Sequence, residues 1–295
     1  MLNEDSCSAA GAFSSQQSAL SIQSRICKRQ SRIRGSITII TFGIFGNSGK
    51  FCVGVGLWLL IAHYSATLSP VIKDYVPAGL KSFFLSGPAG RLEALLNEGR
   101  PDAHFSALVC HPHPLYGGTV HNKVVYRAMK ALHSFGFPVL RFNFRGAGLS
   151  EGEHDRGYGE VDDVRTGLKW LYSEYHLPII FCGFSFGAAT GLRAACPDPN
   201  VVGLISLGTP VAAEGRVYTY QFLHDCGRPK LFVSGALDQY SPQEKLREVV
   251  AAAAEPKELR LVQAADHFFE GHLPELQDAI QEWISKNFPG AVKGS

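Results

Sequence analysis

The serine of Gly183–Gly187, which reads Gly-Phe-Ser-Phe-Gly, is the residue best placed for nucleophilic chemistry. An apolar run, Pro178–Cys182, leads into it, and small residues that a helix tolerates follow it. A serine at such a strand-to-helix turn sits in strained backbone that exposes its Oγ, and the flanking glycines leave room for the turn. The same turn directs the backbone N–H of Phe186 toward a developing oxyanion. The pattern therefore predicts that Ser185 is the nucleophile.

A nucleophilic serine needs a histidine that takes its proton and an acid that orients the histidine. His267 follows the last predicted strand and Asp238 follows the strand before it, where loops can return both side chains to Ser185. His272 is a weaker base because it leads directly into the closing helix. Asp266 is a weaker acid because neighbouring side chains of an extended segment point apart. We therefore predict that Ser185, His267 and Asp238 form a catalytic triad.

A second Gly-x-Ser-x-Gly, Gly148–Gly152, competes for the role of nucleophile. No strand runs directly into it, and it continues into a polar stretch, Glu151–Arg156. Without a strand before it, the segment does not match the turn that exposes a catalytic serine. We interpret it as a loop at the rim of the site and expect Ser150 to be dispensable for activity.

The loop His111–Gly118 follows a predicted strand and can supply a second oxyanion donor. Its two prolines lack an N–H group and stiffen the loop, which leaves the amides of His111, His113 and Leu115 near the strand end. A stiff donor suits an oxyanion hole because it needs no reorganisation during the reaction. We expect the N–H groups of His113 and Phe186 to form this hole.

The same loop allows a rival interpretation as a metal site, because His111, His113 and His121 cluster there. Residues i and i+2 of an extended segment share a face, so two of these side chains could bind one ion. No nearby set of carboxylates and histidines completes the pattern. We therefore expect neither a metal nor another cofactor.

Strand and helix patterns alternate between residues 76 and 288 and can position these side chains. The later strands are continuous apolar runs, which indicates cover on both faces. This alternation predicts an α/β fold with a mostly parallel central sheet, helices on both faces and ligands at the carboxyl ends of the strands. The strands besides Pro178–Cys182 are expected at Lys81–Leu85 and Arg91–Leu96, which form a hairpin, and at Phe105–Cys110, Pro138–Asn143, Val201–Leu207, Lys230–Ser234 and Glu258–Val262. The helices are expected at Val124–Phe135, capped by Asn122, and at Val161–Tyr175, Pro242–Ala254 and Leu273–Phe288.

Residues 1–75 differ from the rest of the chain and are expected to form an extension to the domain 76–295. Residues 1–36 are rich in Ser, Gln and Ala and carry a basic cluster, a composition typical of disorder. The apolar residues 37–62 are interrupted by Asn47–Lys50, and each part is shorter than the ~20 residues that cross a bilayer. We interpret the extension as disordered or non-native, with membrane association through residues 37–62 as the alternative.

Composition narrows the class of protein. The chain has 295 residues, is 45% hydrophobic and carries a formal net charge of +2, so it can bury one large core and has no general attraction to nucleic acid. Its seven cysteines are odd in number and contain no C-x-x-C pair. Cys110 and Cys182 fall in apolar strands, where a thiol acts as a small hydrophobe. These features predict a cytoplasmic protein without a disulfide framework or a zinc ribbon.

Four segments carry a family resemblance: His111–Val125, Phe142–Gly152, Gly183–Gly187 and Asp266–Phe269. They resemble the α/β-hydrolase superfamily, and most closely a group of compact bacterial members related to dienelactone-hydrolase-like and prolyl-oligopeptidase-like catalytic domains. The resemblance spans about residues 76–288. It implies an α/β-hydrolase fold in which nucleophile, acid and base follow one another along the chain.

The residues and the resemblance together predict a serine hydrolase that acts on a small-molecule acyl ester or thioester through an acyl-enzyme. Acyl transfer or peptide cleavage by the same triad, and a non-catalytic scaffold, are the alternatives. About twenty residues separate strands Val201–Leu207 and Lys230–Ser234, which predicts a small or absent cap and an open site. We expect loops His111–Gly118, Gly148–Gly159 and Thr209–Arg228 to form the acyl pocket.

Overall fold

The computed structural model describes residues 79–212 and 216–291. Every strand and helix expected between residues 81 and 288 falls in this part of the chain. The expectations for residues 1–75, including the apolar stretch 37–62 as a membrane anchor, lie outside it, so the domain boundary stays a prediction. Across the described residues, no helix has the length and apolar character needed to cross a membrane.

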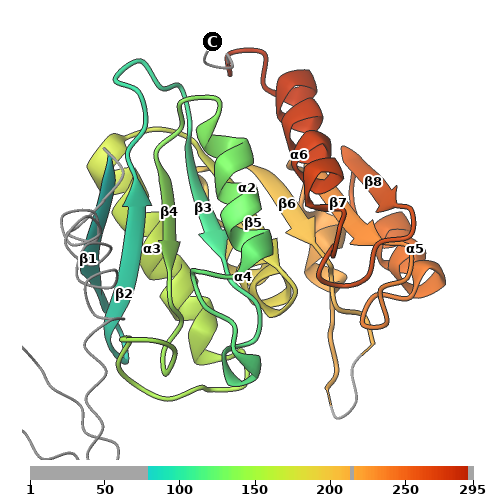
Figure 1. Ribbon diagram of the computed structural model, residues 1–295, viewed down its shortest axis with the longest axis horizontal. Helices are drawn as coiled ribbons and strands as arrows, with labels where there is room; N and C mark the ends of the chain where they lie inside the picture. The colour runs from blue at the N-terminus through green and yellow to red at the C-terminus, as the bar shows by residue number, and fades with distance from the viewer. Residues whose placement is uncertain (1–78, 213–215, 292–295) are drawn as a thin grey trace, which may run out of the picture. The chain divides into compact units, whose positions relative to one another are not determined.

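Among the described residues, eight strands form one open sheet (Figure 1). Their bounds are β1 (Leu80–Gly87), β2 (Gly90–Asn97), β3 (Ser106–Cys110), β4 (Val139–Phe142), β5 (Ile179–Phe184), β6 (Val201–Leu207), β7 (Lys230–Gly235) and β8 (Lys257–Val262). The order across the sheet is β1-β2-β4-β3-β5-β6-β7-β8. β2 pairs antiparallel with β1 and β4, and all other pairs are parallel. The predicted α/β fold with a mostly parallel sheet and an opening hairpin is therefore confirmed.

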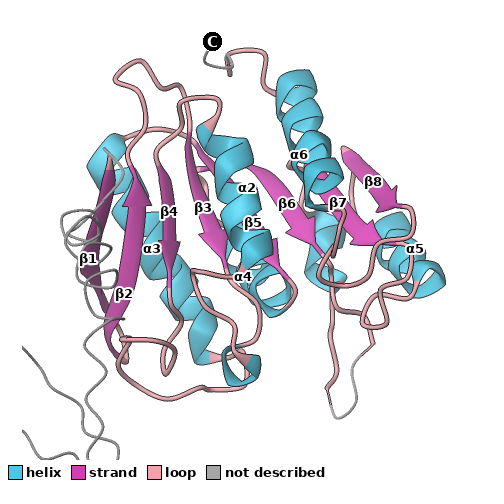
Figure 2. Ribbon diagram, viewed as in Figure 1, coloured by secondary structure: helices cyan, strands magenta, loops and turns pink. Residues whose placement is uncertain are grey.

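Helices cover both faces of the sheet, as predicted (Figure 2). Their bounds are α2 (Lys123–His133), α3 (Gly159–Tyr175), α4 (Phe186–Ala195), α5 (Gln243–Ala252) and α6 (Leu273–Asn287), with short 3₁₀ helices η1 (Pro114–Tyr116) and η2 (Gln221–Asp225). Side chains of α2 and α6 join one buried cluster, and those of α3, α4 and α5 join another. The two 3₁₀ helices, which the sequence did not predict, lie in the loops after β3 and β6.

The central strands are apolar on both faces because helices cover both. All five residues of β3 and all six of β5 are buried. Successive side chains of a strand point to opposite faces, so Phe181 joins the cluster of α3 and α4, while Ile180 joins that of α2 and α6. Since parallel strands end at one edge of the sheet, the loops that follow β3, β5, β7 and β8 meet there.

The starts of two helices show how local side chains define them. The Asn122 side chain accepts hydrogen bonds from two N–H groups of α2, at 2.9 and 3.4 Å, which confirms it as the cap. Helix α3 begins at Gly159, two residues earlier than expected. The buried carboxylate of Glu160 accepts hydrogen bonds from the N–H groups of Asp155 and Gly157, both at 2.8 Å, and so folds the chain that enters this helix.

The structure departs from the cysteine prediction at one pair. A disulfide joins Cys196, at the end of α4, to Cys226, just after η2, with Cα atoms 5.9 Å apart. The partners are 30 residues apart in sequence, and β6 lies between them, so no local spacing could reveal the pair. This disulfide does not support the reducing compartment that the cysteine pattern predicted. Cys110 and Cys182 are buried free thiols, as predicted.

Candidate active site

Ser185 lies between the end of β5 and the start of α4, at the predicted strand-to-helix turn. Its backbone has φ 54° and ψ −118°, a strained conformation for a residue with a side chain. A Cβ added at Gly183 would overlap the backbone of α4, and one added at Gly187 would overlap the carbonyl oxygen of His111. Close backbone approach therefore requires both glycines. A 2.9 Å hydrogen bond from the Ser185 N–H to the Leu207 carbonyl holds the turn against β6.

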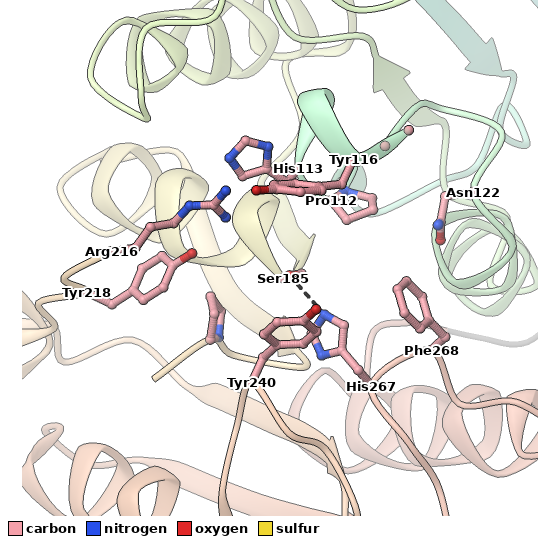
Figure 3. Close-up of a pocket in the computed structure, with 13 residues that line it drawn as sticks. Pro112, His113, Tyr116, Asn122, Ser185, Arg216, Tyr218, Tyr240, His267 and Phe268 are labelled. Atoms are coloured by element: carbon pink, nitrogen blue, oxygen red, sulfur yellow. Dashed lines mark hydrogen bonds between the residues drawn. The ribbon is translucent and has the colours of Figure 1, made fainter. Parts of the chain in front are cut away.

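The structure brings Ser185, His267 and Asp238 into one chain of hydrogen bonds. Nε2 of His267, in the loop after β8, lies 3.0 Å from Oγ of Ser185 (Figure 3). Nδ1 of the same ring lies 2.8 Å from Oδ2 of Asp238, in the loop after β7. When Nδ1–H donates to the carboxylate, Nε2 carries the lone pair that can accept a serine proton. The geometry is that of a nucleophile, a base and an orienting acid.

Further hydrogen bonds fix the Asp238 carboxylate. The N–H groups of Tyr240 (2.9 Å) and Ser241 (3.1 Å) donate to its Oδ1, and the Ser234 hydroxyl donates to Oδ2 at 3.3 Å. Asp238 is 4% exposed, and His267 is 3% exposed. These bonds hold the carboxylate in one orientation, and the carboxylate in turn fixes the imidazole ring.

The two weaker triad candidates have other partners. Oδ1 of Asp266 accepts hydrogen bonds from two N–H groups of the following turn, both at 3.0 Å, and so shapes the loop that carries His267. His272 is the residue before α6, as expected, and its Nδ1 lies 3.2 Å from the carboxylate of Glu275. Asp266 therefore stabilises the loop beside His267, and His272 contacts the first turn of α6.

Ser150, the competing serine, makes hydrogen bonds that stabilise its loop. Its hydroxyl donates to the carbonyl of Asn143 (2.7 Å) and accepts from the N–H of Glu93 (2.9 Å). These bonds hold its loop against β2. None of the residues that line the pocket beside Ser185 comes from 148–159. Residues 148–159 therefore add no side chain to the lining of this pocket, but His154 of the same loop packs against the rings of His113 and Phe186.

His113 and Phe186, the predicted oxyanion donors, lie side by side with ring centres 4.8 Å apart. Among the residues described, neither backbone N–H has a hydrogen-bond acceptor. By contrast, the N–H of Leu115 donates to Nδ1 of His113 at 3.2 Å and is not free. A backbone N–H group that lies next to a nucleophile and has no acceptor in the protein can donate to an oxyanion. His113 and Phe186 stay the candidates for this role.

His111 anchors the loop that carries His113. The Phe144 N–H donates to its Nε2 at 2.9 Å, so the ring proton sits on Nδ1, which donates to the Pro112 carbonyl at 2.6 Å. The ring is fully buried, and burial lowers its pKa to about 4, so it is neutral at neutral pH. Both nitrogens are occupied, which disfavours the rival metal interpretation. Within the described ranges, no group of three or more His, Cys, Asp or Glu residues is placed to hold a metal.

The sequence did not predict the residues that surround the His113 ring. The ring centres of Tyr116 and His154 lie 5.0 and 4.7 Å from it, and Nδ1 of His154 lies 2.6 Å from the buried Glu160 carboxylate. Burial, followed by the nearby charges of Arg216 and His154, lowers the pKa of His113 to about 4. The ring is therefore uncharged near neutral pH. These contacts join segments far apart in the chain and leave no sequence signal.

A pocket of about 310 Å³ lies beside Ser185 at the carboxyl ends of the strands (Figure 3). A volume of this size suits a small molecule. Thirteen residues line it, most of them from the loops after β3 and β6, which agrees with two of the three loops expected to form it. Among the lining residues that the sequence did not single out are Arg216, Tyr218 and Tyr240.

Comparisons with known proteins match most of the described chain. A family model described as "Serine aminopeptidase, S33" matches residues 107–225. An uncharacterized protein of Rickettsia prowazekii is 32% identical over 212 residues, which cover 70% of this chain and 89% of that protein. An uncharacterized protein of Mycobacterium tuberculosis is 30% identical over 179 residues, which cover 53% of this chain and 63% of that protein.

Two solved structures are similar in both fold and sequence. An alpha-beta serine hydrolase homologue from Coxiella burnetii superposes with a TM-score of 0.63 at 36% identity, covering 68% of this chain and 96% of that chain. A protein from Xanthomonas campestris, described as an a/b serine hydrolase without lid, superposes with a TM-score of 0.63 at 32% identity, covering 72% of this chain and 97% of that chain. The similarity extends over almost the whole length of the two solved chains.

Proposed function

The chain belongs to the α/β serine hydrolase family, and on this premise we propose that it hydrolyses an acyl ester or thioester through an acyl-enzyme on Ser185. One observation carries the proposal: His267 is hydrogen-bonded to Ser185 Oγ through one ring nitrogen and to Asp238 through the other. A serine hydroxyl is a weak nucleophile until a base takes its proton. This arrangement supplies both the base and the acid that orients it.

The proposed reaction has two halves. In the first, Nε2 of His267 takes the Ser185 proton as Oγ bonds to the acyl carbon, and the carbonyl electron pair moves to oxygen. The intermediate then expels the alcohol or thiol, which receives the proton from His267. In the second, water gives a proton to His267 and attacks the acyl-enzyme, and the acid leaves as Ser185 regains its proton. Asp238 stabilises the charged imidazole in each half.

The N–H groups of His113 and Phe186 are proposed to bind the negative oxygen of each intermediate. Removal of one such donor typically lowers turnover ~10²–10³-fold. The anchored ring of His111 supports the proposal because it holds the His113 loop before substrate arrives. A donor that is already in place costs no reorganisation in the transition state.

Peptide cleavage is the second candidate, because the matched family model is described as a serine aminopeptidase. An aminopeptidase must bind the ammonium group at the start of its substrate, and a carboxylate is the natural partner of such a cation. Within the described part of the chain, none of the thirteen residues that line the pocket is Asp or Glu. We therefore favour an ester or thioester substrate. Acyl transfer would use the same groups with an alcohol or amine in place of water.

The segment between β6 and β7 supports a preference for short, soluble substrates. Its described residues contain one short helix, η2, as the prediction of a small or absent cap requires. A site without a large cap has no lid that a lipid surface would need to open. We propose that the enzyme shows no rate jump when the substrate forms micelles.

A series of p-nitrophenyl esters from acetate to octanoate tests the proposal. Wild-type protein should release p-nitrophenol from the short esters, and Ser185→Ala should lose at least ~10³-fold in kcat/KM. Ser173→Ala, which changes an exposed serine on α3, serves as the matched control and should keep its activity. Full activity in Ser185→Ala would contradict the proposal. Faster cleavage of aminoacyl p-nitroanilides than of any ester would favour the peptidase instead.

A further inference from the structure

The described residues that line the pocket beside Ser185 carry one permanent charge. Among its thirteen lining residues, Arg216 is the only Lys, Arg, Asp or Glu. The lining histidine His113 is neutral near pH 7, since its pKa lies at about 4. Among the described lining residues, a negatively charged ligand would therefore meet one cation and no carboxylate that repels it.

Arg216 is held over an aromatic ring of the pocket. Its Cζ lies 5.0 Å from the centre of the Tyr116 ring. Figure 3 shows the guanidinium directed toward Tyr116 and His113, into the pocket. A cation over a ring interacts with the π face and leaves its N–H groups for other partners. Within residues 79–212 and 216–291, no hydrogen bond or ion pair ends on this guanidinium.

The charge of Arg216 acts inside the pocket. It is the largest cause, after burial, of the lowered pKa of His113, whose N–H is a proposed oxyanion donor. Arg216 and Ser185 line the same pocket, so a group attached to a substrate at Ser185 can reach the guanidinium. Tyr218 also lines the pocket, and its hydroxyl is a second hydrogen-bond donor beside the Arg216 guanidinium.

We propose that Arg216 binds a carboxylate on the ester or thioester that this enzyme cleaves. A planar guanidinium binds a carboxylate through two parallel N–H···O hydrogen bonds, so the substrate would be an ester with a free acid on its acyl or leaving part. A half-ester of a dicarboxylic acid is the simplest such compound. The inference rests on the proposed hydrolase function and names the substrate class of the same site.

A competing role for Arg216 makes a different prediction. If the guanidinium only stabilised the oxyanion, its removal would slow charged and neutral esters by the same factor, because both form the same intermediate. If it binds a substrate carboxylate, its removal lowers the preference for the charged ester. The ratio of kcat/KM between two matched esters therefore separates the roles.

The experiment compares two pairs of esters of equal length. In the first pair, mono(p-nitrophenyl) adipate and its methyl ester differ by a charge on the acyl part. In the second, m-acetoxybenzoate and its methyl ester differ by a charge on the leaving part. For at least one pair, wild-type protein should prefer the charged ester by about tenfold or more, the range of a hydrogen bond to a charged group.

Variants then assign the preference to one side chain. Arg216→Met should reduce the ratio to about one or below, and Arg216→Lys should give an intermediate ratio because it keeps the charge without the two-pronged geometry. Arg247→Met removes an exposed arginine from α5 and should leave the ratio unchanged. Circular dichroism and thermal unfolding confirm that each variant is folded.

Two results would overturn the inference: a wild-type ratio of one or less for both pairs, or an equal loss on charged and neutral esters in Arg216→Met. Either could occur while the neutral esters are still cleaved, and the proposed hydrolase function would then stand. If no ester is cleaved and a fluorophosphonate does not label Ser185, the hydrolase function itself fails and the inference fails with it.

Discussion

The backbone N–H of Phe144 donates a 2.9 Å hydrogen bond to Nε2 of His111 and so joins the chain after β4 to the loop after β3. The second ring nitrogen donates to the Pro112 carbonyl, which precedes His113. A buried neutral histidine thus acts as a clamp: one ring nitrogen accepts a hydrogen bond and the other donates one, and together they fix the loop that carries a proposed oxyanion donor. The clamp acts only while the ring is uncharged, since a protonated Nε2 could not accept a hydrogen bond.

His111→Phe should lower both stability and turnover. Phenylalanine fills the space of the ring but leaves the N–H of Phe144 and a buried carbonyl unpaired, at a cost of about 1–3 kcal/mol per lost partner. Urea unfolding and kcat on p-nitrophenyl acetate measure the two effects. His121→Phe is the control, because that side chain is exposed and does not line the pocket. Loss of activity in the control, with inhibition by chelators, would restore the metal interpretation.

Acid should destabilise the protein through His111 and His113. Both have a pKa near 4 in the folded state, below the ordinary value of 6.5, so the unfolded chain binds more protons between these values. The stabilisation is therefore complete above about pH 6.5 and is lost as the pH falls toward 4. For the buried His111 the slope reaches ~1.4 kcal/mol per pH unit. Urea unfolding at several pH values should show that the free energy of unfolding of His111→Phe depends less steeply on pH than that of the wild-type protein. Equal slopes would show that His111 does not contribute to the loss of stability in acid.

His113→Pro isolates the backbone N–H at that position. The backbone of His113 has φ −56°, which proline adopts without strain, so the variant should fold. His113→Ala is the matched control because it removes the same ring and keeps the N–H. Turnover of the proline variant should be ~10²–10³-fold below that of the alanine variant. Equal kcat values in the two would show that the His113 amide plays no part in the oxyanion hole.

Ser150→Ala should cost stability and leave most of the activity. The hydroxyl makes two hydrogen bonds that join its loop to β2 and to Asn143, the residue after β4, so its loss should lower the free energy of unfolding by about 1–2 kcal/mol. Measured kcat/KM on a short ester should stay near the wild-type value. Inactivation of a well-folded Ser150→Ala protein would make this serine the nucleophile and refute the assignment of Ser185.

The elements and the positions that bring Ser185, His267 and Asp238 together could be predicted because their signals are local. An apolar run before Gly183–Gly187 marks β5, and alternation of strand and helix patterns fixes which loops share an edge with Ser185. Asp238 and His267 are then the suitable residues in the loops after the last two strands. Helix ends were less certain, as at Gly159, where a buried Glu160 orders the preceding loop and extends α3.

Tertiary contacts without a local pattern could not be predicted. The disulfide between Cys196 and Cys226 depends on how the segment after β6 returns to the end of α4. The position of Arg216 over Tyr116 likewise depends on two loops that are distant in sequence. The hydrogen bonds of Ser150 could not be predicted for the same reason, because its partner Glu93 lies on a strand far earlier in the chain.

Covalent labelling with a fluorophosphonate, followed by mass mapping of the modified peptide, tests the role of Ser185 most directly. The reagent phosphonylates a serine whose proton is taken by a neighbouring base, so one adduct is expected on Ser185. The label should be absent from Ser185→Ala and strongly reduced in His267→Ala, which keeps the serine and removes the base. A label on Ser150, or a folded wild-type protein without any label, would contradict the proposal that Ser185 is the nucleophile.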